Sequence, residues 1–136
     1  MFKILAYLFA IERQSKAIHY SAKGNEFYGD HLLCDRIYDG ISDLEDEIFE
    51  NYYLGREQEA PSQKDIFKSA TDLIPQNADD LRIAFEDLDK LVMGCIAEIQ
   101  SLVEIDKELT AGDNDLLGRI CSDLQKKHGF IVRRLK

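Results

Sequence analysis

The sequence predicts an all-α protein, a single domain over residues 1–136 built as a bundle of four long helices with one short extra helix. Two observations predict this fold class. Apolar residues recur at spacings of three and four along most of the chain, which is the period of an amphipathic helix, and only two prolines and eight glycines interrupt it. With 45% hydrophobic residues, a chain of this length buries a sizeable core without disulfide or metal staples.

The first two helices are expected over residues 2–22 and 27–54. The first begins as an apolar run, but Glu12 and Arg13 follow where a signal peptide would have small residues, so we expect a buried helix. The second helix is followed by Gly55, a residue that favours helix ends. Its apolar stripe consists of Leu33, Ile37, Ile41, Leu44, Ile48 and Tyr52.

A short helix is expected in the long connection between the second and third helices. Ser62 follows Pro61 and offers a side-chain oxygen as N-cap. The amphipathic segment behind it ends before Pro75, which cannot continue a helix.

The third and fourth helices complete the bundle. Asn77 is the expected N-cap of the third, which runs to about Ile105 with Asp79 and Asp80 in its first turn, where the helix dipole favours them. A break over residues 106–114 leads into the fourth helix. Four long helices with one long crossover between the second and third have the connectivity of a ferritin-like bundle.

Charge and composition narrow the function classes. A net charge of −9 and a pI near 4.8 argue against a general affinity for nucleic acid and favour cationic partners, including metal ions. No stretch of about 18 uncharged apolar residues occurs, which argues against a membrane span. Cys34, Cys95 and Cys121 are odd in number and far apart, so we expect reduced core thiols in a cytoplasmic protein.

Four side chains on the second expected helix suggest a metal site. At 100° per residue, His31, Asp35, Asp46 and Glu50 share one face of a continuous helix. Asp35 and Asp46 are about 16 Å apart along that helix, too far for one ion. His31 pairs with Glu50, and Asp35 with Asp46, about the same midpoint in the sequence, between residues 40 and 41. An antiparallel second copy would therefore bring His31 near the other chain's Glu50. We therefore expect a homodimer with two identical sites and with Gly40 at the two-fold axis, where a missing side chain allows close approach.

The ligand types favour iron. Carboxylates with imidazole form a borderline-hard set that suits iron, with manganese and zinc as alternatives for the same site. Carboxylates stabilise the harder Fe(III) product and a histidine accommodates Fe(II), which is the physical case for a ferroxidase.

The stretch from His19 to His31 resembles the Dps family of mini-ferritins. The shared pattern is a histidine followed by an aromatic residue, a basic residue and glycine at the turn, a phenylalanine, and a second histidine. The family's ferroxidase ligands are a histidine, a histidine twelve residues on, Asp four later, Asp eleven later and Glu four later. His19, His31, Asp35, Asp46 and Glu50 fill these positions. The resemblance implies that the first three come from one chain and the last two from its partner.

What the resemblance implies is an iron-storage ferroxidase. The family builds hollow twelve-subunit shells that oxidise Fe(II), preferably with hydrogen peroxide, store the ferric product and protect against oxidative stress. The acidic turn that contains Asp106, Asp113 and Asp115 resembles the segment lining the family's iron-entry pores, where carboxylates draw cations inward.

The sequence departs from the family in two respects. It has no tryptophan, and Tyr20 stands where many relatives carry one beside the first histidine. The chain begins directly with its first helix and lacks the Lys-rich tail of DNA-binding relatives, so DNA binding is not expected.

His128 has no other potential metal ligands near it in the sequence pattern, and we expect it to be structural or exposed. The basic residues near the C-terminus are expected to form a solvated helix end: Lys126, Lys127, Arg133, Arg134 and Lys136.

Two alternatives to the ferroxidase stay open at this point. One is a bundle that binds zinc or another divalent ion only to hold its dimer together. The other is a DNA-condensing protein, which predicts salt-sensitive retardation of DNA by the assembled shell.

Overall fold

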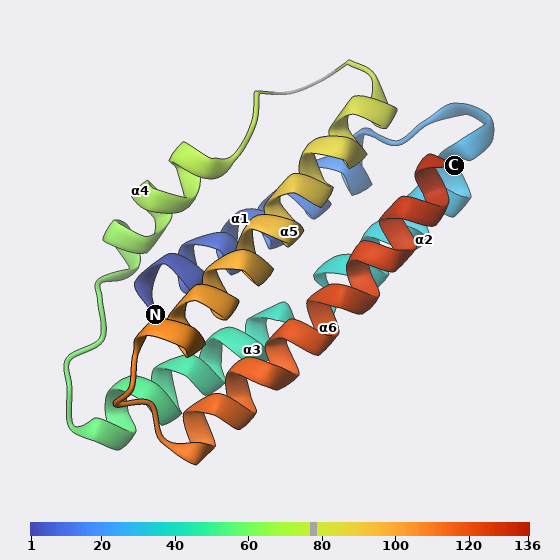
Figure 1. Cartoon of the computed structure of the whole chain (residues 1–136). Coiled ribbons are helices and arrows are strands. Elements are labelled where there is room, and N and C mark those ends of the chain that lie inside the picture. The colour runs from blue at the N-terminus through green and yellow to red at the C-terminus, as the bar shows by residue number, and fades with distance from the viewer. Residues whose placement is uncertain (77–78) are drawn as a thin grey trace.

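A computed structural model of the chain describes residues 1–76 and 79–136, and this part of the chain is helical with no strand. Three long helices are continuous: α1 (Phe2–Ser21), α5 (Leu81–Ile105) and α6 (Ala111–Leu135). The fourth rod of the bundle is α2 (Phe27–Tyr38) followed by α3 (Ile41–Glu47) (Figure 1). The all-α four-helix prediction is confirmed.

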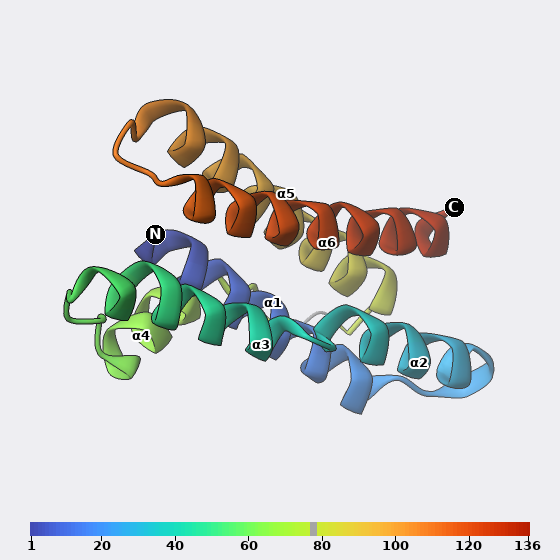
Figure 2. The ribbon, with the colours of Figure 1, turned by 90° about the horizontal axis from the view of Figure 1, so that it is seen from below.

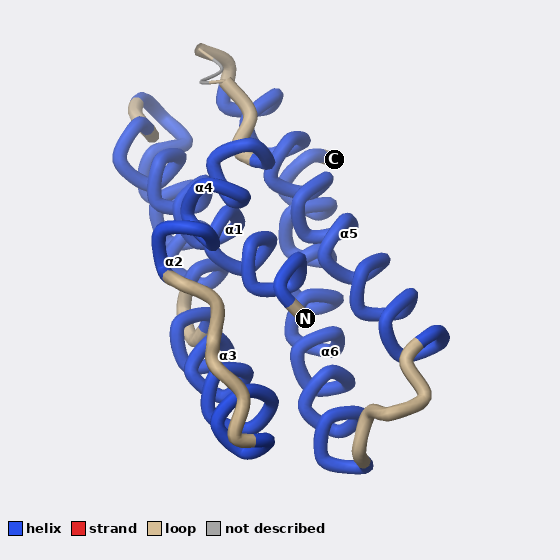
Figure 3. The backbone as a smooth tube through the Cα atoms, turned by 90° about the vertical axis from the view of Figure 1, so that its left-hand side faces the viewer, coloured by secondary structure: helices blue, strands red, loops and turns tan. Residues whose placement is uncertain are grey.

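The remaining elements are short and lie between or beyond these rods. A 3-10 turn, Gly24–Glu26, joins α1 to α2. A π-helical segment, Ile48–Tyr53, and a 3-10 turn, Leu54–Arg56, extend α3. The predicted extra helix is α4 (Gln63–Leu73), which packs against α1, and the connection that precedes it runs along the outside of the bundle (Figure 3).

The core lies between two layers, with α5 and α6 paired against the layer that contains α1, α2 and α3 (Figure 2). Each long helix turns one apolar stripe inward because its apolar residues recur every three or four positions. Leu8 on α1, Phe85 on α5 and Leu124 on α6 are fully buried. Burial of each such side chain stabilises the fold by about 1.5–3 kcal/mol, and this rigid core holds the facing ends of α1 and α2 in register. No helix in residues 1–76 and 79–136 is long and apolar enough to cross a membrane.

The second helix is broken, so the prediction of one continuous helix over residues 27–54 is wrong. Asp39 leaves the helical region with ψ of 131°, and Gly40 takes the left-handed conformation with φ of +78°. Glycine reaches that conformation at little steric cost, whereas other residues rarely adopt it. Because the helix is interrupted at Asp39 and Gly40, helical spacing no longer places Asp46 and Glu50 on the face of His31 and Asp35. A role for Gly40 at a two-fold axis stays a prediction.

A buried lysine lies beneath the break. Lys127 on α6 is 2% exposed; its ammonium donates to the backbone carbonyl of Asp39 at 3.0 Å and pairs with the Asp123 carboxylate at 2.5 Å. The carbonyl that the broken helix leaves free is thereby satisfied from a different helix. The prediction that Lys127 belongs to a solvated helix end is wrong, because its ammonium is buried in the bundle and paired with Asp123.

Capping residues explain where α4 and α5 begin. The predicted N-cap of α4 is confirmed, since the Ser62 hydroxyl accepts from the backbone N–H of Asp65 at 3.1 Å. For α5, Asn77 lies outside the described residues, and Asp80 is itself an N-cap that accepts from the N–H of Arg82 at 2.8 Å. Asp79 and Asp80 therefore precede α5 instead of occupying its first turn.

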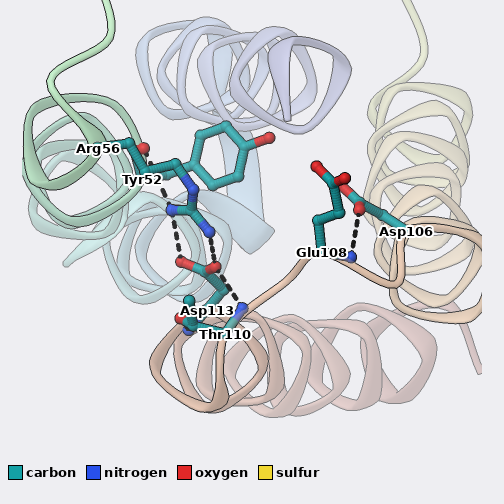
Figure 4. Close-up of polar contacts among 6 residues, drawn as sticks. All are labelled: Tyr52, Arg56, Asp106, Glu108, Thr110 and Asp113. Carbon is teal, nitrogen blue, oxygen red and sulfur yellow. Dashed lines mark hydrogen bonds and ion pairs between the residues drawn. The ribbon is translucent and has the colours of Figure 1, made fainter.

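The last helix begins earlier than predicted. Thr110 and Asp113 form a capping box: the Thr110 hydroxyl accepts from the N–H of Asp113 at 3.1 Å, and the Asp113 carboxylate accepts from the N–H of Thr110 at 2.8 Å (Figure 4). These two bonds satisfy donors that a helix end would otherwise leave free, so α6 begins at Ala111, inside the predicted break of residues 106–114.

Candidate metal centre

Three of the five predicted ligands lie together where α1 ends and α2 begins. The chain reverses direction over residues 22–26, which places the last turn of α1 beside the second turn of α2. One ligand atom each from His19, His31 and Asp35 lie within 4.8 Å of one another. Within residues 1–76 and 79–136, no other group of three or more His, Cys, Asp or Glu side chains meets this spacing.

Each histidine ring is held by the backbone of the other. Nδ1 of His19 lies 3.1 Å from the carbonyl oxygen of His31, and Nδ1 of His31 lies 3.3 Å from the carbonyl oxygen of His19. Since a carbonyl oxygen only accepts, each Nδ1 carries the proton and each Nε2 keeps a lone pair for a metal. The two rings stack with centroids 3.5 Å apart, and the centroid of the Phe27 ring lies 5.0 Å from that of the His31 ring.

The carboxylate of Asp35 completes the cluster at its outer edge. Its Oδ1 lies 3.4 Å from Nδ1 of His19 and accepts a hydrogen bond from the Tyr38 hydroxyl. This hydrogen bond is the largest of the effects that raise the pKa of Tyr38 to about 12. The His19 side chain is 12% exposed and that of Asp35 is 43% exposed, so the centre is covered on the protein side and open at the surface. Three protein ligands leave coordination positions for water, for an oxidant or for further protein groups.

An ion pair anchors the start of α2. Asp30, immediately before His31, is 1% exposed, and Arg134 from the last turn of α6 donates to both of its oxygens, at 2.5 and 3.1 Å. The Arg134 guanidinium also lies over the ring of Phe85, 5.5 Å from its centroid. A bidentate pair of this kind fixes orientation as well as position. Arg134 is therefore not part of a solvated helix end, as the sequence predicted, but holds the segment that carries His31.

Asp46 and Glu50 do not join the cluster within this chain. Both are exposed, Asp46 on α3 and Glu50 on the π-helical segment, on the far side of the break at Gly40. The assignment of these two carboxylates to the site of a partner chain stays a prediction.

The three predicted pore carboxylates differ in burial: one is buried and two are more accessible. Figure 4 shows the hydrogen bonds of Asp113 and Asp106. Asp113 is 3% exposed and paired bidentately with Arg56, whose hydrogen bonds are the main reason that the pKa of Asp113 lies below its ordinary value. A buried, neutralised carboxylate draws no cation from solvent, so Asp113 serves the fold. Asp106 is half-buried and accepts from the N–H of Glu108 at 2.9 Å, and Asp115 is exposed.

His128 and the buried cysteines, which could in principle also bind a metal, have structural roles. Nδ1 of His128 lies 2.7 Å from the Asp89 carboxylate, which fits the structural role expected of this histidine. The three cysteines are free thiols, and burial raises the pKa of Cys34 to about 12 and that of Cys95 still further. These two thiols are unreactive at neutral pH because the thiolate is the reactive form.

Sequence reasoning missed Tyr38, Asp30 and Arg134. Tyr38 could have been found, since it lies one turn after the predicted ligand Asp35 on the same helix. The pair of Asp30 and Arg134 is 104 residues apart in the chain, and no local pattern signals it.

Among known proteins, this chain is similar to solved structures, while comparisons of its sequence find no match. No protein-family model and no curated protein matches the sequence. The solved structure of Dps from Thermosynechococcus elongatus matches with 25% identity and a TM-score of 0.82, over 98% of this chain and 85% of that one. Mycobacterium smegmatis Dps in a tetragonal form matches with 21% identity and a TM-score of 0.83, over 99% and 83%. A Dps homologue from Halobacterium salinarum matches with 18% identity and a TM-score of 0.79, over 98% and 75%.

Proposed function

On the premise that this chain has the fold of the Dps mini-ferritins, we propose that it is a ferroxidase that oxidises Fe(II) at sites shared between two subunits, stores the ferric product and protects against oxidative stress. The observation that carries the proposal is the cluster of His19, His31 and Asp35. It combines two imidazole nitrogens with a carboxylate oxygen, a donor set that suits Fe(II) and, through the carboxylate, its harder Fe(III) product.

Hydrogen peroxide is the proposed oxidant. Two Fe(II) ions, bound as substrate, give one electron each to one peroxide, which takes up two protons and leaves as two waters. Paired one-electron oxidations release no hydroxyl radical, which is the protective part of the proposal. The role of the chain is to hold two iron ions near each other while leaving coordination positions open to solvent.

A second copy of the chain is the proposed partner at this site. Asp35, Asp46 and Glu50 are accessible in a single chain, and three ligands give an incomplete site. Apolar side chains near the cluster are also exposed, Tyr20 by 78% and Leu32 by 43%. Exposed apolar groups beside an unfinished polar site favour burial in an interface. We extend the proposal to the twelve-subunit shell of the family.

DNA condensation is disfavoured by the same structure. Of the five cationic residues near the C-terminus, Lys127 and Arg134 are engaged inside the bundle, and Lys126 pairs with Asp123 at 3.2 Å. The basic surface is thus smaller than the sequence suggests, on a chain of net charge −9.

Fe(II) oxidation tests the proposed function. The protein is loaded anaerobically with Fe(II), peroxide or oxygen is added, and ferric absorbance is followed for the wild type and for the double variant His31→Ala, Asp35→Ala. We expect rapid oxidation by the wild type, loss in the double variant, and retention in His128→Ala, which removes an imidazole elsewhere. Oxidation no faster than without protein, despite bound metal, would instead indicate a structural site that holds zinc or another divalent ion.

A further inference from the structure

Tyr38 touches the metal cluster without belonging to its predicted ligand set. It is the last residue of α2, one turn after Asp35, and its hydroxyl donates to Oδ1 of Asp35. Its ring lies edge-on to the His19 ring, with centroids 5.7 Å apart and an interplanar angle of 73°. The Lys16 ammonium lies 5.3 Å from the centre of the same ring. Contacts to two residues of α1 therefore hold the ring in one place.

The hydrogen bond from Tyr38 restricts how Asp35 can bind a metal. The Asp35 side chain is 43% exposed, and an aspartate on an open surface exchanges readily between rotamers. Here Oδ1 accepts a hydrogen bond from the Tyr38 hydroxyl, which engages one of its lone pairs, and it lies 3.4 Å from Nδ1 of His19. Oδ2 accepts no hydrogen bond from residues 1–76 and 79–136, so it is the oxygen better able to bind an ion.

We propose that Tyr38 is a positioning residue of the metal centre, which holds Asp35 so that its Oδ2 alone coordinates a divalent cation. The inference rests on the proposed function only in that the cluster of His19, His31 and Asp35 binds metal. A hydrogen-bond partner of a ligating side chain typically contributes a factor of about 10–100 in metal affinity. Removal of the hydroxyl should weaken binding by such a factor, because the free carboxylate must then be ordered by the ion itself.

Two substitutions separate the hydroxyl from the ring. Tyr38→Phe removes only the hydroxyl and keeps the contacts of the ring with His19 and Lys16, so the fold should be retained. Tyr38→Leu removes the ring contacts as well. Tyr28→Phe is the matched control, because Tyr28 lies on the same helix with its side chain 72% exposed.

Binding of Co²⁺ to the full chain is the readout, since it does not depend on oxidation chemistry. Calorimetry gives the affinity, and the visible absorption of Co²⁺ reports its coordination. We expect Tyr38→Phe to bind about 10–100-fold more weakly than the wild type, with a shifted or weakened visible band, and Tyr28→Phe to bind as the wild type does.

The outcomes distinguish this inference from the proposed function. If Tyr38→Phe binds Co²⁺ like the wild type with an unchanged band while Tyr38→Leu and His31→Ala lose binding, the hydroxyl has no positioning role and only the packing of the ring matters. The metal site would stand in that case. If the wild type binds no Co²⁺, or His31→Ala binds it equally well, the metal site and the role of Tyr38 both fall.

Discussion

Glu45 is expected to make the stability of this chain depend on pH. It lies on α3 facing the bundle, 8% exposed, and its Oε1 has no hydrogen-bond partner among residues 1–76 and 79–136. Burial, followed by the nearby charges of Glu12 and Asp46, raises its pKa from an ordinary value of 4.5 to about 8. The fold therefore favours the protonated form of this side chain, while the unfolded chain favours the ionised form near neutral pH.

The direction and size of the effect follow from that difference. Below pH 4.5 Glu45 is protonated in both states and its ionisation costs nothing. As pH rises from 4.5 to about 8, the free energy of unfolding falls, by up to about 1.4 kcal/mol per pH unit. At pH 7 the resulting decrease in the free energy of unfolding is at most about 3 kcal/mol, and partial access of water reduces this decrease to about 2 kcal/mol.

Glu45→Gln should abolish this pH dependence, because glutamine has a similar shape and does not ionise. We expect the variant to be about 2 kcal/mol more stable than the wild type at pH 7 and nearly equal at pH 5. Urea unfolding at pH 5, 6, 7 and 8 measures both values. Glu59→Gln is the control, since Glu59 is exposed and its loss changes the net charge by the same amount. If the two variants shift the urea midpoint equally at every pH, the buried state of Glu45 is not what sets the dependence.

Two buried charges give further predictions of stability. Arg134→Met leaves Asp30 buried without its counter-charge and should cost about 3–5 kcal/mol in urea unfolding. The double variant Arg134→Met, Asp30→Leu should recover most of that loss, and a single-variant loss below about 1 kcal/mol would contradict the assignment. Lys127→Met leaves the Asp39 carbonyl without its donor and removes one of the two ammonium groups that pair with Asp123, and it should cost about 1–3 kcal/mol. Hydrogen exchange should then increase at the start of α3 more than in α5, and equal changes in both helices would argue against a local effect.

Local sequence patterns were sufficient to predict most of the helices and the cluster of His19, His31 and Asp35. His19 and His31 flank a short reversal of the chain, so their spacing alone brings them to the same place. Asp35 follows His31 by one helical turn and so must share its face. None of these placements depends on a distant part of the chain, which is why the sequence could predict them.

The break at Gly40 shows where local reasoning stops. Ile37 and Ile41 are both fully buried, and the apolar spacing continues across the break because the core requires it. The hydrophobic pattern therefore resembles one uninterrupted helix. The backbone carbonyl of Asp39, which the break leaves without a helical partner, accepts a hydrogen bond from the Lys127 ammonium, 88 residues away in the chain. The spacing of apolar residues carries no information about such a contact.

Buried ion pairs were missed for a related reason. Charged residues at a helix end are usually solvated, and that expectation was applied to Arg134, while Asp113 was predicted to lie in an acidic pore segment. Each is paired with a residue from a distant element, Asp30 and Arg56 respectively, and only the packing of the bundle brings those partners together.

Complementation between variant chains tests the shared site most directly. Each of His31→Ala and Glu50→Ala removes a proposed ligand from a different half of the site. When the two are refolded together in equal amounts, half of the dimers contain one chain of each kind, and each such dimer has one intact site out of two. Shared sites predict recovery of about a quarter of the wild-type rate of Fe(II) oxidation, while each variant alone stays inactive. No activity at any mixing ratio, from chains shown to form mixed dimers, would contradict a site built from two subunits.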